Sequence, residues 1–90
     1  MAGSISGIDW VSKIPFGGTY TATSADANAN KSEINTGKAD AVGFIVQVMR
    51  SNINLTDDAK VSMTAGVIAV EDNSSAFEVT NGDVINWIVF

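Results

Sequence analysis

The clearest hydrophobic pattern lies in the second half of the chain. Residues 42–49 alternate along a run rich in β-branched side chains, which predicts a strand that is largely buried on both faces. Residues 60–64 and 67–70 predict two further strands, and residues 53–55 and 76–80 predict shorter ones. Turn signals separate these segments at intervals of roughly 8 to 12 residues, a spacing typical of small sandwiches and barrels.

The chain ends on one more predicted strand, residues 84–90. One face of it carries Val84, Asn86, Ile88 and Phe90, and the other carries Ile85, Trp87 and Val89. Because both sets are largely apolar, we expect both faces to be covered. Asn81-Gly82 precedes this strand and predicts a two-residue type I′ hairpin that joins it to residues 76–80, since that turn needs positive φ at both central positions.

The first forty residues show no sustained period. They are rich in Gly, Ser, Thr, Ala and Asn, which predicts an extended arm over residues 1–40. Within it, residues 19–23 are a strand candidate. Residues 24–34 could form a short helix with Ser24 or Asp26 as its N-cap, although their asparagine content disfavours one.

These patterns predict an all-β fold, a small antiparallel sandwich or partial barrel with an extended N-terminal arm. The compact β domain is expected over residues 41–90. A unit of that size lies near the lower limit for a self-sufficient core, so the arm or another subunit is expected to contribute to it.

The amino-acid composition also favours a contribution from another subunit. The chain is 46% hydrophobic and only 17% charged, against about a quarter charged in a typical soluble domain. We therefore expect more apolar surface than one copy can bury, and a homo-oligomer. The net charge of −5 and the scattered lysines disfavour a nucleic-acid partner. No apolar run approaches the length of a membrane span, so no membrane partner is expected.

The residue types also limit the chemistry. Histidine and cysteine are absent, which removes imidazole and thiolate catalysis and the metal sites built on them. A carboxylate pair or a calcium site is conceivable among the acidic residues Asp57, Asp58, Glu71, Asp72 and Asp83. Their predicted turn positions favour backbone capping instead. We expect no enzyme activity, no cofactor and no metal site.

Large aromatic and aliphatic side chains are the better candidates for binding. Trp10, Ile14 and Phe16 lie in the predicted arm, where they could dock into a pocket of another subunit or fold back over the chain's own sheet. Trp87 and Phe90 complete the candidate interface at the C-terminal strand, although a tryptophan in a terminal strand is more often a core residue than a binding residue. These five residues form the predicted interface.

Two segments, residues 39–46 (ADAVGFIV) and residues 80–87 (TNGDVINW), look like segments of small tailed-phage virion proteins of the capsid decoration or head-fibre type. The resemblance implies a homo-oligomeric β module that sits on a capsid or joins a fibre to the head, and that partners other virion proteins. It also implies a location on the virion after synthesis in the host cytoplasm, and the opening residues show no secretory signal. It assigns no individual site residues.

Two functions therefore remain open from the sequence. The first is a structural virion protein that acts by protein–protein assembly. The second is a small monomeric β-sandwich module that binds a carbohydrate through exposed aromatic residues such as Trp10 or Tyr20.

Overall fold

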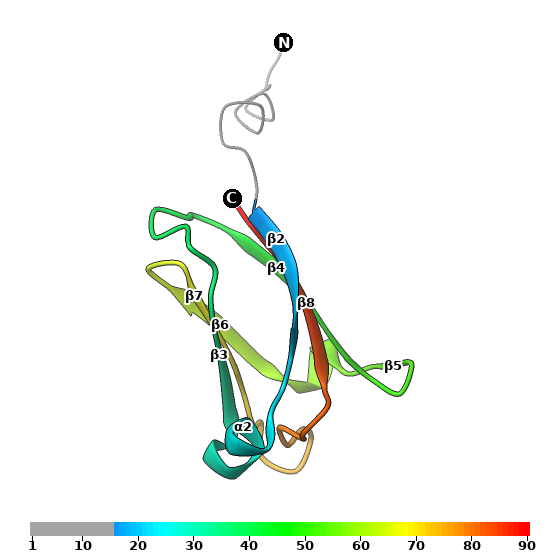
Figure 1. The fold of residues 1–90 in the computed structure, drawn as a ribbon. Helices are drawn as coiled ribbons and strands as arrows, with labels where there is room; N and C mark the ends of the chain where they lie inside the picture. Colours follow the sequence, from blue (N-terminus) through cyan, green and yellow to red (C-terminus); the bar gives the residue numbers. More distant parts are fainter. Residues whose placement is uncertain (1–15) are drawn as a thin grey trace.

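The computed structural model describes residues 16–90, which fold into two antiparallel sheets and one short α-helix. The elements in chain order are β2 (Phe16–Thr21), α2 (Ser24–Ala29), β3 (Lys31–Asn35), β4 (Phe44–Arg50), β5 (Ile53–Asn54), the 3-10 helix η1 (Thr56–Asp58), β6 (Lys60–Thr64), β7 (Val67–Glu71) and β8 (Val84–Val89). One sheet has the order β2-β8-β4-β5 and the other β3-β7-β6. The two sheets face each other, with α2 at one end (Figure 1). The predicted all-β antiparallel sandwich is confirmed.

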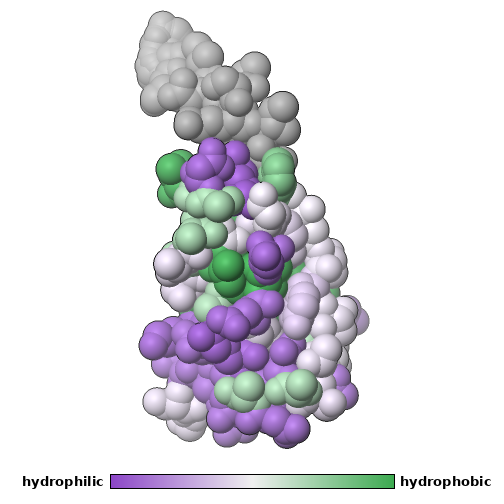
Figure 2. Space-filling view, turned by 60° about the vertical axis from the view of Figure 1, so that its left-hand side comes forward, coloured by the Kyte–Doolittle hydropathy of each residue, from purple (hydrophilic) through white to green (hydrophobic). Residues whose placement is uncertain are grey.

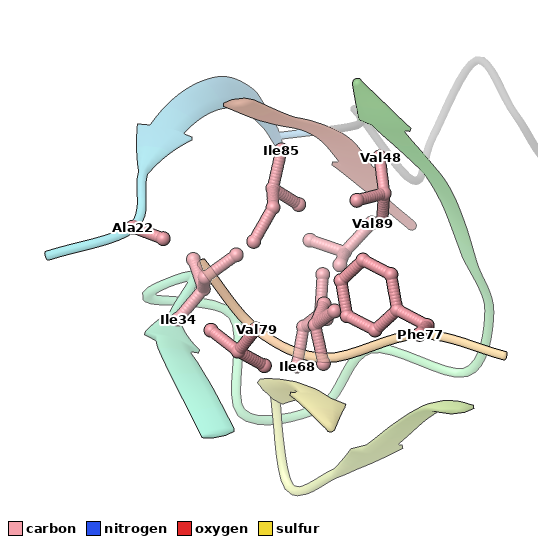
Figure 3. Packing of buried hydrophobic residues seen from close by; sticks show 9 residues of the cluster. Ala22, Ile34, Val48, Ile68, Phe77, Val79, Ile85 and Val89 are labelled. Atoms are coloured by element: carbon pink, nitrogen blue, oxygen red, sulfur yellow. The ribbon is translucent and has the colours of Figure 1, made fainter. Parts of the chain in front are cut away.

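The core lies between the two sheets, and both sheets contribute to it (Figure 3). Its buried apolar side chains are Ala22, Ile34, Val48, Ile68, Val70, Phe77, Val79, Ile85 and Val89. Phe77 and Val79 come from the segment between β7 and β8, which fills the space between the layers without forming a strand. Interdigitation of these side chains from both layers is what holds the sandwich together.

The predicted boundary between an arm over residues 1–40 and a body over residues 41–90 is wrong for the described part of the arm. β2 pairs with β8 along its whole length, and β3 pairs with β7. Ala22 and Ile34 belong to the core. The sequence shows no hydrophobic alternation in this region, because Gly17 and Gly18 carry no side chain and because β3 buries the polar Ser32 on the same face as Ile34. Residues 1–15 of the predicted arm lie outside the described residues.

The short helix exists, but its N-cap is Thr23 and not Ser24 or Asp26. Thr23 and Asp26 form a capping box, in which each side chain accepts a hydrogen bond from the other residue's backbone N–H. This reciprocal pairing satisfies two backbone donors that a helix start otherwise leaves without partners. It therefore offsets the poor helix propensity of the asparagines.

The predicted hairpin at Asn81-Gly82 is also wrong. Residues 76–80 form no strand, and β8 lies between β2 and β4. A turn is present, with the Asp83 N–H donating to the Thr80 carbonyl oxygen at 3.0 Å. Only Gly82 has positive φ (96°), whereas a type I′ turn needs it at both central residues.

The type I′ geometry occurs instead at two other places. Ala65 (φ 50°) and Gly66 (φ 78°) connect β6 to β7, and Ser51 (φ 50°) and Asn52 (φ 68°) connect β4 to β5. Each pair is the complete loop of a two-residue hairpin. An alanine therefore occupies a position where the turn alone would favour asparagine or glycine.

Candidate interaction surface

The outer face of the larger sheet carries two isoleucines side by side. The register of β2, β8 and β4 aligns Gly17, Ile88 and Ile45 in one row across the sheet. Ile45 is 58% exposed and Ile88 is 42% exposed. Because the outer face of a two-layer antiparallel sandwich is normally polar, this apolar pair marks the surface as unusual.

The next row of the same face is polar and internally bonded. It aligns Thr19, Asn86 and Gln47. The Thr19 hydroxyl donates to Asn86 Oδ1 at 2.8 Å, and Asn86 Nδ2 donates to Gln47 Oε1 at 3.1 Å. The chain of bonds fixes all three side chains across three strands. We name this surface, made by Gly17, Thr19, Ile45, Gln47, Asn86 and Ile88, the isoleucine face.

A shallow hollow of about 390 Å³ lies on the isoleucine face. It forms where Gly17 presents no side chain, and Ile45, Gln47, Asn86 and Ile88 contribute to its lining. A methyl group at Gly17 would lie 3.4 Å from Ile88 Cγ1, so a larger residue there would begin to fill the hollow. The fixed amide groups of Gln47 and Asn86 lie beside the two isoleucines. Such a surface suits a partner protein that places an apolar side chain on the isoleucines and hydrogen-bonding groups around it.

The predicted interface residues separate in the structure. Trp87 points inward and packs against the core, under Gly18, where an added Cβ would lie 2.9 Å from its Cζ2 atom. Phe90 lies over Gly43, where an added Cβ would lie 2.7 Å from Cζ. Phe16 is 44% exposed, with Lys38 Nζ 5.6 Å from its ring centroid. Trp10 and Ile14 lie outside the described residues.

The expectation that both faces of the strands at residues 42–49 and 84–90 are covered is wrong for this chain by itself. In β4, Val48 is buried while Ile45 and Gln47 are exposed. In β8, Ile85 and Val89 are buried while Ile88 is exposed. The other sheet covers only the inner face of each strand, so the apolar side chains on the outer face stay in contact with water.

Sequence reasoning did not single out Ile45 or Ile88. Both appeared in alternating runs without an obvious inside and outside, because valine and isoleucine occupy both faces. Gln47 and Asn86 are the polar residues inside these runs, and they pair with each other across β4 and β8. Because side chains alternate between the two faces of a strand, Ile45 and Ile88, each two positions away, lie on the same outer face. This alternation was the signal that could have identified them.

On the face shown in Figure 2, hydrophilic residues gather over the lower part, and a smaller hydrophilic group lies at the upper end. The most hydrophobic residues lie at the middle of this face and at the upper end, away from α2. Phe16 and the C-terminal residue lie at the end away from α2 (Figure 1). The exposed Val42 (75%) belongs to the loop that leads into β4.

Three of the five acidic candidates for catalysis or calcium binding have structural partners. Asp83 is 1% exposed and forms an ion pair with Arg50. Asp72 Oδ1 accepts a hydrogen bond from the Val79 N–H at 2.6 Å, and Glu71 lies 4.0 Å from Lys31 Nζ. Asp57 and Asp58 form the first turn of η1. Within residues 16–90, no group of three or more acidic, histidine or cysteine side chains could hold a metal ion.

A second polar cluster surrounds Asp26. Its Oδ2 atom accepts hydrogen bonds from the Tyr20 hydroxyl at 2.6 Å, the Thr23 N–H at 3.1 Å and the Ser32 hydroxyl at 3.1 Å. Partial burial acts to raise the pKa of Asp26, but these donors outweigh it and hold the pKa below its usual value. The hydrogen bond from the Tyr20 hydroxyl to Asp26 raises the pKa of Tyr20. Asp26 thus joins β2, α2 and β3, and the Tyr20 hydroxyl is occupied.

No protein-family model matches the chain, and neither a curated protein nor a solved structure matches it. Among the described residues, no helix has the length and apolar character needed to cross a membrane.

Proposed function

We propose that this protein is a non-catalytic structural subunit that assembles with further copies of itself and with other protein subunits through the isoleucine face. The observation that carries the proposal is the exposed pair Ile45 and Ile88, fixed side by side on adjacent strands. Leaving two adjacent isoleucines in water forgoes their burial energy, about 1.5–3 kcal/mol for each fully buried side chain. A partner that covers them recovers it.

The virion is the proposed location, with capsid or fibre subunits as further partners. This part of the proposal depends on the two segments that resemble small tailed-phage virion proteins. The first segment extends into β4 and contains Ile45, and the second extends into β8, the strand that pairs with β4. The resemblance therefore concerns the part of the chain that builds the proposed surface.

The mass of the full chain in solution tests the assembly. We expect sedimentation velocity from about 5 to about 200 µM to give a species heavier than the 9.4 kDa monomer, because mass action favours assembly at the higher concentrations. Ile45→Ser combined with Ile88→Ser should shift the mass toward the monomer. The matched control is Val42→Ser combined with Ile53→Ser, which also removes two exposed apolar side chains but leaves the isoleucine face intact.

A monomer at every concentration would overturn the proposed self-assembly. A monomer whose tryptophan fluorescence is quenched by a saccharide would support the carbohydrate-binding alternative instead. For the virion, the protein should co-sediment with phage particles purified from a culture that produces it, and its absence from those particles would contradict the proposed location.

A further inference from the structure

Within the part of the chain that the structure describes, β2 has an edge whose backbone groups lack a partner. Ala22 N–H donates to the Asp83 carbonyl oxygen at 2.8 Å, which continues the register of β2 with β8 and fixes which residues bond to β8. Since bonding alternates along an antiparallel strand, Gly17, Thr19 and Thr21 direct their N–H and C=O groups away from β8. Within residues 16–90, no backbone partner bonds to these groups.

The other sheet edges carry features that discourage pairing. β5 is two residues long. β3 carries Lys31 and Glu33, and β6 begins with Lys60. Short length and charged side chains are the usual ways in which proteins protect a sheet edge. β2 has six residues with no charge and no proline among them, so it is the least protected edge of the described residues.

The sequence of β2 is also complementary to itself. If two copies meet antiparallel with Thr19 opposite Thr19, the outward pairs are Thr19 with Thr19 and Gly17 with Thr21. The inward pairs are Gly18 with Tyr20 and Phe16 with Ala22. Every large aromatic side chain then faces a glycine or an alanine, and the central pair is two threonines, which favour each other across strands.

We propose that two copies of this chain pair through β2, antiparallel, around a two-fold axis at Thr19. The pairing rests on the proposed function, and it adds a second contact between copies beside the isoleucine face. It satisfies the free groups of Gly17, Thr19 and Thr21 with about six backbone hydrogen bonds. It also joins two four-stranded sheets into one continuous sheet, with the two isoleucine faces on the same side.

One substitution tests the outer edge of β2 without disturbing its pairing with β8. Thr19→Pro removes the N–H group that points away from β8, and proline is tolerated where the N–H faces outward on an edge strand. Thr19→Val is the matched control, because it also removes the bond to Asn86 and has a similar size but keeps the N–H. By sedimentation velocity on the full chain, wild type and Thr19→Val should show the same mass, at least twice the 9.4 kDa chain mass, and Thr19→Pro should show half of it.

Hydrogen exchange of the wild type gives a readout that does not depend on a variant folding. In the dimer, the amides of Gly17, Thr19 and Thr21 should exchange slowly at high concentration and at least about tenfold faster on dilution. The amides of Gly18 and Tyr20, which bond to β8, should stay protected at both concentrations.

The outcomes separate this inference from the proposed function. If Ile45→Ser with Ile88→Ser lowers the mass, but Thr19→Pro keeps the wild-type mass and the Gly17, Thr19 and Thr21 amides exchange freely, the β2 pairing is overturned and the proposed function stands. A wild type that is monomeric at every concentration overturns both. Concentration-independent protection of the three amides in a monomer means that residues 1–15 of the same chain cover the edge, and also overturns the pairing.

Discussion

Arg50 and Asp83, one at the end of β4 and the other directly before β8, are joined by two parallel hydrogen bonds. Arg50 Nε donates to Asp83 Oδ1 at 2.7 Å, and Arg50 Nη2 donates to Asp83 Oδ2 at 2.9 Å. Nη2 also donates to the Glu78 carbonyl oxygen, and the Thr80 N–H donates to Asp83 Oδ2. The pair therefore ties the irregular segment before β8 to the sheet, and the bond to Asp83 raises the pKa of Arg50.

Asp83→Asn should destabilise the fold by about 3 kcal/mol, because it leaves the Arg50 guanidinium without its carboxylate in a partly buried site. Asp40→Asn is the control, since the Asp40 side chain is 85% exposed and its ion pair with Lys38 should contribute less than about 1 kcal/mol. Urea unfolding measures both free energies. Equal losses in the two variants would contradict the role assigned to Asp83.

Acid should weaken the fold through Asp26. Because its folded pKa lies below its ordinary value, the carboxylate stabilises the native state above about pH 4, and that contribution is lost as the pH falls through the folded pKa. The free energy of unfolding of the wild type should decrease below about pH 4, and more steeply than that of Asp26→Asn. Parallel pH profiles of the two proteins would argue against this assignment.

Removing the Tyr20 hydroxyl tests the same cluster from the other side. Tyr20→Phe should cost about 1 kcal/mol, the typical contribution of one hydrogen bond. NMR titration should show the pKa of Asp26 rising toward its ordinary value, because a donor to the carboxylate is gone. In the wild type, ultraviolet titration should place the Tyr20 pKa above 10, and Asp26→Asn should lower it. An Asp26 pKa that is unchanged in Tyr20→Phe would disprove the link.

Ala65→Gly should stabilise the protein by about 0.5–1 kcal/mol. Ala65 has positive φ in the type I′ turn, where an L side chain costs energy that glycine does not. Ala25→Gly, the same change in the exposed helix α2, should instead destabilise by up to about 1 kcal/mol. Thermal unfolding of both variants gives the two signs, and a loss of stability in Ala65→Gly would refute the turn assignment.

Gly18→Ala should destabilise the fold by about 1–3 kcal/mol through overpacking, because the new methyl group would press on the Trp87 indole. In a Trp10→Phe background, which leaves Trp87 as the sole tryptophan, the fluorescence maximum should shift as the ring moves. Thr21→Ala, at another exposed position of the same strand, serves as the control for a change in side-chain size. An unshifted spectrum with full stability in Gly18→Ala would mean that Trp87 does not pack beneath β2.

The segments with alternating side chains were predictable from the sequence. β6, β7 and the edge strand β5 lie within one or two residues of their predicted positions, and the lack of histidine and cysteine in the chain limits its chemistry whatever the fold. β2 was also visible in part, since residues 19–23 were a strand candidate, whereas β3 overlaps the helix candidate over residues 24–34. Their membership of the sandwich was not, because glycine, serine and threonine give no hydrophobic period even when they are buried.

The sequence by itself determined that this protein is a small β structure with excess apolar residues, because strand periodicity and composition are local properties of the chain. Only the tertiary structure decided which face of β4 and β8 is covered, which turn takes the type I′ form and which sheet edge is open. These depend on which strands pair, and pairing joins residues far apart in the chain, such as Thr19 with Asn86 and Arg50 with Asp83. No short-range pattern carries that information.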